Sequence, residues 1–149
     1  MKALMVDVDG VIVHPAHSGG WAACLETDLG ISIGLLQTAF FQPHWQDVSL
    51  GRAGLEERLA PVLAKIAPHL RVEVLMDYWF RYDACLNEPL LADLAVWRSR
   101  GVALHLATVQ EHQRARYLWE DLGLRDRFDA IHYSAALGCA KPVLASMAR

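Results

Sequence analysis

The sequence predicts a mixed α/β fold in which a doubly wound, Rossmann-like core of parallel strands carries an all-helical insertion. Short apolar runs bounded by turn residues predict buried strands at residues 3–6, 102–108 and 129–134. Roughly a hundred residues separate the first two strands, far more than one strand-helix-strand crossover requires. The 149 residues, 54% of them hydrophobic, describe a globular protein of ordinary size with room for a real core.

Two aspartates directly follow the first strand. Asp7 falls at its carboxyl end, the edge of an open α/β sheet where ligands bind, and Asp9 points the same way if the two-residue period continues. One carboxylate can then act as a nucleophile or metal ligand and the other as a general acid. Gly10 lets the backbone bend closely past a ligand, and the amides of residues 8–11 could cradle an anion. The alternative is an acidic turn that binds nothing, which the preceding apolar strand disfavours.

The insertion has the apolar periodicity of helices. The spacing of Trp and Leu predicts a helix over residues 21–29, and Ser32 is suited to cap a second one. Further stripes predict helices over residues 55–66, where a proline either kinks the helix or starts a new one, and over residues 72–80.

The rest of the chain alternates as a doubly wound sheet requires. A helix over residues 90–100 ends at Gly101, which suits a left-handed cap. A helix over residues 111–122 closes with Gly123 before the last predicted strand. The predicted domains are an α/β core domain of residues 1–14 and 87–149 and a helical cap domain of residues 15–86.

Three short motifs resemble those of the haloacid dehalogenase (HAD) superfamily, whose members are mostly magnesium-dependent phosphatases. The stretch Asp7-Val8-Asp9-Gly10-Val11 looks like the first motif of the superfamily. The strand that ends at Thr108 is similar to the second motif, in which Ser or Thr holds a phosphoryl oxygen. The third motif, in which a Lys opens a helix and neutralises charge at the nucleophile and phosphate, resembles Gly138-Cys139-Ala140-Lys141-Pro142. The motifs occur in the family's order and span nearly the whole chain.

Two features depart from the family pattern. The family often has Asn after the second-motif hydroxyl, where this chain has Val109, which can offer a phosphate only its backbone amide. An acidic fourth motif normally completes the magnesium site, but no Asp or Glu follows Asp129 and the sequence ends at Arg149. The resemblance therefore implies a core that is incomplete at its C-terminus, weakened magnesium binding and an unpaired flank on the first strand. An exposed edge strand invites pairing with another chain, so we expect a homo-oligomer.

The resemblance implies a hydrolase, a phosphatase that acts on a small phosphorylated metabolite through an aspartyl-phosphate under a helical cap. Asp7 would attack phosphorus, and Asp9 would protonate the leaving group and then activate water. The implied cofactor is Mg²⁺, with Asp7 and Asp9 as its ligands. Thr108 and Lys141 would complete the catalytic set. The residues implied to bind the phosphate are Val8, Gly10, Thr108, Val109 and Lys141.

Two other functions stay open at this point. A 2-haloacid dehalogenase would use Asp7 on carbon, but displacement of halide does not need the acid that Asp9 supplies. The chain could instead be a catalytically weak or inactive remnant, or a binding protein, that keeps the fold without the fourth motif. A phosphatase screen with and without magnesium would separate these alternatives.

Several residues outside the strand ends have competing interpretations. His14 and His17 are three residues apart, but the proline between them and the lack of an apparent third ligand favour exposed or hinge histidines over a metal site. Cys139 lies beside the third-motif lysine, although a small buried side chain is its simpler role. The tryptophans of the insertion could line a pocket, with core packing as the default. They are Trp21, Trp45 and Trp79.

Composition and charge exclude several classes of protein. The net charge of −3 and the lack of a Lys/Arg-rich run argue against a nucleic-acid partner. Residues 29–46 carry no charged side chain, but their polar residues and glycines argue against a membrane span. Three dispersed cysteines and the absence of a secretory pattern favour a reduced, cytoplasmic setting. We therefore expect a cytoplasmic enzyme whose partner is a small phosphorylated substrate.

Overall fold

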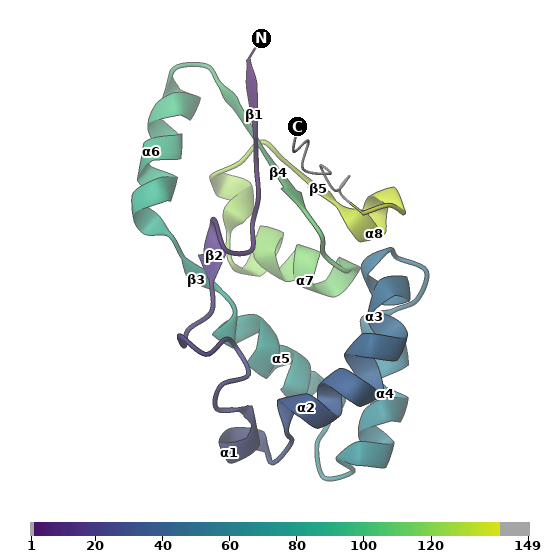
Figure 1. The fold of residues 1–149 in the computed structure, drawn as a ribbon. Helices are drawn as coiled ribbons and strands as arrows, with labels where there is room; N and C mark the ends of the chain where they lie inside the picture. The colour runs from purple at the N-terminus through teal and green to yellow at the C-terminus, as the bar shows by residue number, and fades with distance from the viewer. Residues whose placement is uncertain (1, 141–149) are drawn as a thin grey trace, which may run out of the picture.

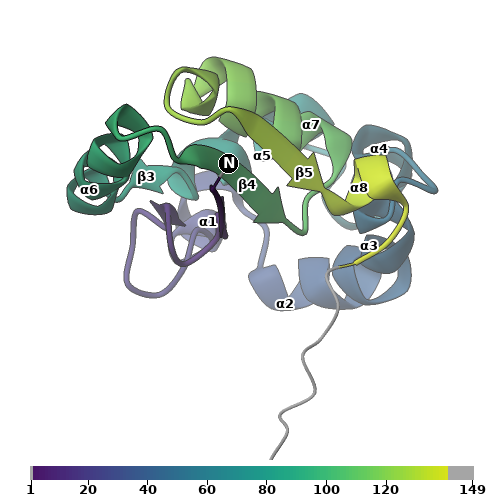
Figure 2. The same cartoon turned by 90° about the horizontal axis from the view of Figure 1, so that it is seen from above.

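The computed structural model describes residues 2–140 and contains a parallel sheet next to a group of helices (Figure 1). The sheet consists of β1 (Ala3–Val6), β4 (Ala103–Thr108) and β5 (Ala130–Tyr133), with β4 between the other two (Figure 2). Met5 pairs with His105 and Leu106 pairs with Ile131. The predicted α/β class is confirmed, and each strand lies within one residue of its predicted bounds.

The chain between β1 and β4 is mostly helical, as its periodicity predicts. Its helices are α1 (Leu25–Leu29), α2 (Ile33–Leu36), the π-helical turn η1 (Gln37–Phe41), α3 (Gln42–Ser49), α4 (Leu55–Ile66) and α5 (Val72–Tyr82). Ser32 caps α2 as expected, because its side-chain oxygen accepts a hydrogen bond from the Leu35 amide at 3.2 Å. The choice left open at Pro61 is resolved, since α4 continues through it as one helix.

A short antiparallel ladder joins the insertion to the core. There β2 (Val13–His14) pairs with β3 (Cys85–Leu86), so the chain leaves and re-enters the core at one place (Figure 1). Helix α6 (Glu88–Ser99) then leads to β4. The elements from β4 onward that complete the core are α7 (His112–Arg116), the π-helical turn η2 (Tyr117–Asp121), the 3-10 turn η3 (Leu124–Asp126) and, after β5, α8 (Ser134–Leu137).

Two hydrophobic clusters fill the molecule. One is made by the insertion, where the ring of Trp79 lies 5.4–5.6 Å from the rings of Trp21, Phe41 and Trp45. The core-packing interpretation of the three tryptophans is confirmed. The other cluster joins β1 and β4 to apolar residues of α6 and η2. The β2–β3 ladder belongs to this second cluster through Val13 and Leu86. The first cluster lies almost entirely within residues 21–82, inside the predicted domain limits at residues 15 and 86, which stay a prediction.

One face of the sheet is covered and the other is partly open. Leu104 and Leu106 of β4 are buried, while the residues alternating with them are only half-buried. In β1, Leu4 is 40% exposed and Met5 is 54% exposed. Ala3 is also exposed, so the expectation of a buried first strand is wrong for all of β1 except Val6. The reason is that within residues 2–140 β1 pairs with β4 alone and lies at the edge of the sheet.

Two further expectations concern the membrane and the cysteines. Within residues 2–140 no helix combines the length and the apolar character that crossing a membrane would demand. All three cysteines are free thiols. Cys139 is exposed, so the expectation that it is a small buried side chain is wrong.

Candidate active site

The end of β1 presents two carboxylates at an accessible edge. Val6 and Val8 are buried whereas Asp7 and Asp9 are exposed, so the alternation of the strand continues past its last residue as predicted. Gly10 then turns the chain with a positive φ of 74°, a conformation that favours glycine. Both aspartates therefore lie at the carboxyl end of β1, where the sequence predicts a reactive site.

Gln110 connects the end of β1 to the end of β4. Thr108 is the last residue of β4 and is 3% exposed. The side-chain amide nitrogen of Gln110 donates to Asp9 Oδ2 at 2.5 Å and to Thr108 Oγ1 at 3.2 Å. The structure thus brings together two of the predicted site residues, Asp9 and Thr108, through a third that the sequence analysis did not select.

Arg114 occupies the other side of Asp9. Its side chain is 2% exposed, and its Nη2 lies 3.1 Å from Asp9 Oδ1, 2.9 Å from the carbonyl oxygen of Asp83 and 3.3 Å from Asp83 Oδ2. The buried Nη1 has no hydrogen-bond partner among the residues that the structure describes. Burying a guanidinium is costly unless it is paired, and the contacts of Arg114 with Asp9 and Asp83 offset this cost.

Glu111 fixes the start of the helix that carries Arg114. Its carboxylate caps α7 by accepting hydrogen bonds from the backbone amides of Gln113, at 2.8 Å, and Arg114. Burial raises the pKa of Glu111, against the effect of these backbone amides. Burial also raises the pKa of Asp83, while the guanidinium of Arg114 acts in the opposite direction.

A second polar contact reaches the site from the insertion. The hydroxyl of Ser134, at the start of α8, donates to the carbonyl oxygen of Ser49 at 2.6 Å. It also accepts a hydrogen bond from the backbone amide of Gln110 at 3.1 Å. Next to it, Gly51 has a φ of 73°, and a Cβ placed there would lie 2.3 Å from the Ala135 carbonyl oxygen. The end of α3 is therefore packed closely against the core beside Gln110.

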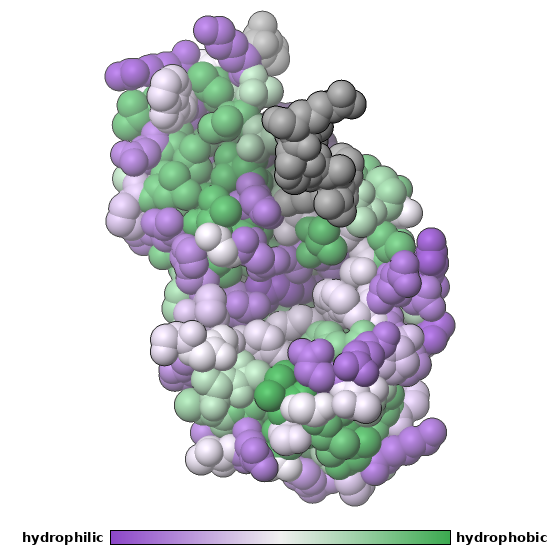
Figure 3. Space-filling model, viewed as in Figure 1, coloured by the Kyte–Doolittle hydropathy of each residue, from purple (hydrophilic) through white to green (hydrophobic). Residues whose placement is uncertain are grey.

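The surface between the sheet and the insertion is hollowed, and hydrophilic residues gather there (Figure 3). Two of the polar contacts that cross from one side to the other are those of Arg114 with Asp83 and of Ser134 with Ser49. Both converge on the residues that bond to Asp9. This makes the accessible edge around Asp7 and Asp9 the best candidate for a catalytic centre.

The predicted phosphate-binding amides have other partners in this structure. The Val8 amide donates to Asp7 Oδ1 at 2.7 Å, and the Gly10 amide donates to the Val13 carbonyl oxygen at 2.8 Å. Either amide would have to exchange its present acceptor for a phosphate oxygen. Val109 is 38% exposed just beyond β4. Lys141 lies outside the described residues.

The acidic edge offers magnesium a sparse set of ligands. Among residues 2–140 no group of three or more His, Cys, Asp or Glu side chains could hold a metal ion. Both oxygens of Asp9 accept from Gln110 or Arg114. Mg²⁺ often binds through one or two carboxylates together with waters and substrate phosphate. Asp7 and Asp9 therefore fit the ion if waters and the phosphate of the substrate supply its other ligands.

The two histidines that the sequence places near the first motif lie at the connection between core and insertion. His14 belongs to β2, and the ring of His17 stacks on Tyr82 with the centroids 5.6 Å apart. Neither belongs to a metal-binding group within the described part of the chain. This location agrees with the hinge interpretation.

Sequence reasoning missed Gln110, Arg114 and Asp83. Gln110 stands two residues after Thr108, so the strand period that relates Asp9 to Asp7 could have drawn attention to it. Arg114 precedes Leu118 by four residues, which places a charged residue on the apolar face of its helix. No signal in the sequence identifies Asp83, because its contact with Arg114 joins residues 31 positions apart.

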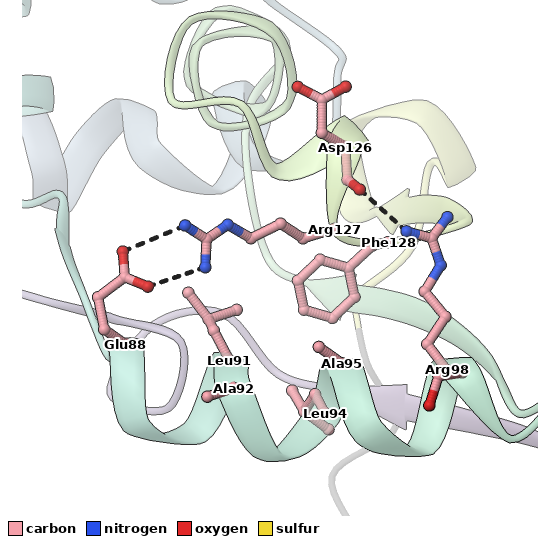
Figure 4. A pocket seen from close by; sticks show the side chains of 10 residues that line it. Glu88, Leu91, Ala92, Leu94, Ala95, Arg98, Asp126, Arg127 and Phe128 are labelled. Atoms are coloured by element: carbon pink, nitrogen blue, oxygen red, sulfur yellow. Dashed lines mark hydrogen bonds and ion pairs between the residues drawn. The ribbon is translucent and has the colours of Figure 1, made fainter.

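A separate pocket lies along α6 near the amino end of β5 (Figure 4). It has a volume of about 530 Å³ and an apolar floor that includes Leu91, Leu94 and Phe128. The cations of its rim have partners, since Arg127 forms two hydrogen bonds with Glu88 and Arg98 forms an ion pair with Asp129 at 2.8 Å. Because ligands of open α/β sheets bind at the carboxyl ends of the strands, this pocket is not the candidate catalytic site.

No protein-family model matches the chain, and neither does any curated protein sequence. Solved structures do match. A HAD family enzyme from Bacteroides thetaiotaomicron, in complex with magnesium, aligns with a TM-score of 0.72 at 15% identity over 96% of this chain and 72% of its own. A structure of that enzyme with magnesium and inorganic phosphate gives a TM-score of 0.68 at 13% identity, over 96% and 73% of the two chains. A predicted HAD-like family hydrolase from Porphyromonas gingivalis gives 0.69 at 17% identity, over 95% and 70%.

Proposed function

Because the chain has the fold of HAD family enzymes, we propose that it is a phosphatase acting on a small phosphorylated metabolite through an aspartyl-phosphate. The observation that carries this proposal is the joining of Asp9 and Thr108 by Gln110, directly beside Asp7 at the carboxyl ends of β1 and β4. A carboxylate pair next to a strand-end hydroxyl suits the attack, protonation and phosphoryl binding that this reaction requires.

In the first step a carboxylate oxygen of Asp7 forms a bond to phosphorus while the bond from phosphorus to the leaving oxygen breaks. Asp9 gives its proton to that leaving oxygen and becomes a carboxylate. In the second step water attacks phosphorus, Asp9 accepts the proton, and the bond from Asp7 to phosphorus breaks. Thr108 and Lys141 hold the oxygens of the transferring group. Dividing one displacement into two steps lowers the barrier of each.

Magnesium is the proposed cofactor, with Asp7 and Asp9 as its protein ligands. When bound, it would offset the negative charge on the transferring phosphoryl group. The magnesium complexes of the enzyme from Bacteroides thetaiotaomicron support this choice for a chain of the same fold. Binding is expected to be weak, because within residues 2–140 no third acidic side chain joins the two.

The hydrogen bonds of Asp9 with Gln110 and Arg114 favour one alternative function, a weakly active or inactive binding protein that keeps the fold. With both oxygens of Asp9 bonded to donors, a phosphorylated ligand could be held without turnover. The two functions differ in one measurable property, which is release of inorganic phosphate.

A phosphatase screen with and without magnesium tests the proposal. We expect magnesium-dependent release of phosphate from small phosphate esters by the wild type and none by Asp7→Asn, which keeps the shape of the side chain. Asp93→Asn, at an exposed position of α6, is the matched control and should match the wild type. Retained activity in Asp7→Asn would reject the assigned nucleophile, and phosphate binding without turnover would support the alternative.

A further inference from the structure

Next to Asp9 lies the guanidinium of Arg114, a charged group to which the proposed reaction assigns no role. Arg114 is buried and contacts Asp9 Oδ1, while Gln110 contacts Asp9 Oδ2. Both carboxylate oxygens of Asp9, the proposed acid, therefore accept hydrogen bonds from side chains. One of the two donors, Arg114, is charged and buried. Such paired donors fix the orientation of a carboxylate.

The other contacts of Arg114 are with the insertion. Asp83 directly follows α5 and precedes β3, at the place where the insertion rejoins the core. Its backbone carbonyl and its carboxylate both lie within 3.3 Å of the Nη2 that contacts Asp9. One nitrogen thus joins the proposed acid to the end of the insertion.

We propose that Arg114 is a positioning residue for Asp9, which it ties to Asp83 at the hinge of the insertion. The inference rests on the proposed function for its catalytic meaning. When Asp9 gives its proton to the leaving oxygen, negative charge develops on its carboxylate. Arg114 and Gln110 then face that charge as preorganised donors, so no group has to reorient during the transfer.

The role of Arg114 as a positioning residue predicts a specific kinetic pattern. Misplacing the acid should lower kcat by up to about 100-fold for an alkyl phosphate, whose leaving group needs a proton. The loss should be much smaller for p-nitrophenyl phosphate, whose leaving group departs without one. KM should change little for either substrate, because Arg114 does not contact the phosphoryl group in this account.

Three variants and a control separate this role from a purely structural one. Arg114→Met removes the charge at similar length, and Arg114→Lys keeps a charge and should restore part of kcat. Arg116→Met is the matched control in the same helix, since Arg116 is 78% exposed and pairs only with Glu120 among the described residues. If Arg114→Met does not fold, Asp83→Asn replaces it, because it removes one contact of Arg114 and keeps the carbonyl acceptor. It should show the same leaving-group pattern at smaller size.

A second measurement does not depend on turnover. In a double-mutant cycle, Asp9→Asn and Arg114→Met should shift the thermal unfolding midpoint non-additively, because each removes the same contact. Additive shifts, equal loss of kcat on both substrates, or absence of rescue by Arg114→Lys would overturn the role of Arg114. Turnover that does not depend on Asp7 would overturn the proposed function instead, and the cycle would still decide whether Arg114 holds Asp9.

Discussion

The two ends of the sheet each carry an arginine bonded to an aspartate, and the two pairs differ in almost every other respect. At the amino end, Arg98 donates to Asp129 Oδ1 from Nε at 3.2 Å and from Nη2 at 2.8 Å, and its Nη1 donates to the Asp126 carbonyl oxygen. The second oxygen of Asp129 accepts from the Leu104 amide at 2.8 Å. All of these groups belong to the α/β core, and every nitrogen of this guanidinium has a partner.

At the carboxyl end the arginine is buried and its hydrogen bonds are incomplete. Arg114 shares one nitrogen among Asp9 and two oxygens of Asp83, and its other terminal nitrogen has no partner within residues 2–140. Its partners come from two different parts of the chain, the first motif and the end of the insertion. The Arg98 pair, with all its hydrogen bonds formed, suits a structural role, and the incompletely bonded Arg114 pair is the one that the proposal assigns to the positioning of Asp9.

The pKa values of Asp129 and Asp83 shift in opposite directions, because the surroundings of the two carboxyl groups differ. The Leu104 amide, followed by Arg98, holds the pKa of Asp129 below its usual range. Burial raises the pKa of Asp83 more than Arg114 lowers it. Hydrogen bonding to the charged form prevails at the exposed end, and loss of hydration prevails at the buried end.

The largest predicted effect concerns Asp9 itself. Asp9→Asn removes the proposed proton donor and should reduce turnover by ~10²–10⁴-fold on substrates with poor leaving groups, and by less on good ones. Asp129→Asn, at the other end of the sheet, should leave turnover unchanged. Steady-state rates of both variants on an alkyl and an aryl phosphate check the contrast. Equal losses of turnover in Asp9→Asn and Asp129→Asn would contradict a catalytic role for the carboxyl end of the sheet alone.

The next effect concerns the packing of the insertion against the core. Gly51→Ala must adopt a positive φ and also meets the Ala135 carbonyl oxygen. Gly101→Ala has the same kind of φ, 87°, but nothing within 4 Å, so it is the matched control. We expect about 1–2 kcal/mol of destabilisation for Gly101→Ala and clearly more for Gly51→Ala. Urea unfolding measures both, and equal losses would show that the close contact between α3 and α8 is unimportant.

A smaller effect is the pH dependence of stability, which should have opposite signs at the two ends. Because the pKa of Asp129 is lowered by folding, its contribution is present above the unfolded value of about 3.9 and is lost as pH falls through the folded value. Because the pKa of Asp83 is raised, its contribution is present below the unfolded value and is lost as pH rises through the folded one.

Thermal unfolding from pH 3 to pH 7 of the wild type, Asp129→Asn and Asp83→Asn tests this. The gap between wild type and Asp129→Asn should shrink as pH falls. The stability of wild type relative to Asp83→Asn should instead increase as pH falls. Parallel curves for the two variants would contradict the assigned causes of the shifts.

The smallest effect concerns the edge of the sheet. Met5 is 54% exposed on β1, which lies at the edge of the sheet formed within residues 2–140. If the chain self-associates through this edge, Met5→Lys should lower the associated fraction in sedimentation experiments without changing turnover, because an edge lysine opposes strand pairing. Val96→Lys, at another exposed apolar position, is the control and should have no effect on association. Association that is unchanged by Met5→Lys would exclude this edge.

Most of the fold could be predicted because its elements are defined by local patterns. Ser32 and Gly101 mark a helix start and a helix end by their own chemistry, and the strand before Asp7 is a short apolar run with a turn after it. The exposure of Met5 could not be predicted, since an apolar strand has the same sequence whether it is central or at an edge. Burial in a sheet depends on neighbours that are distant in the chain.

The site divides in the same way. Asp7, Asp9 and Thr108 follow directly from strand ends, and the structure joins Asp9 to Thr108 through Gln110. Arg114 and Asp83 depend on how the insertion packs against the core, which no periodicity encodes. The contact between Asp83 and Arg114 was therefore the part of the site that sequence alone could not supply.

The most direct test of the central claim is to trap the covalent intermediate on Asp7. The Asp9→Asn variant, which lacks the proposed base for the attacking water, is mixed with p-nitrophenyl phosphate and magnesium, quenched in acid and mapped by peptide mass spectrometry. We predict one phosphoryl group on the peptide that contains Asp7, and none when Asp7→Asn is added to the variant. Magnesium-dependent turnover by the wild type, with no phosphoryl group on Asp7 in any quenched sample, would contradict the account.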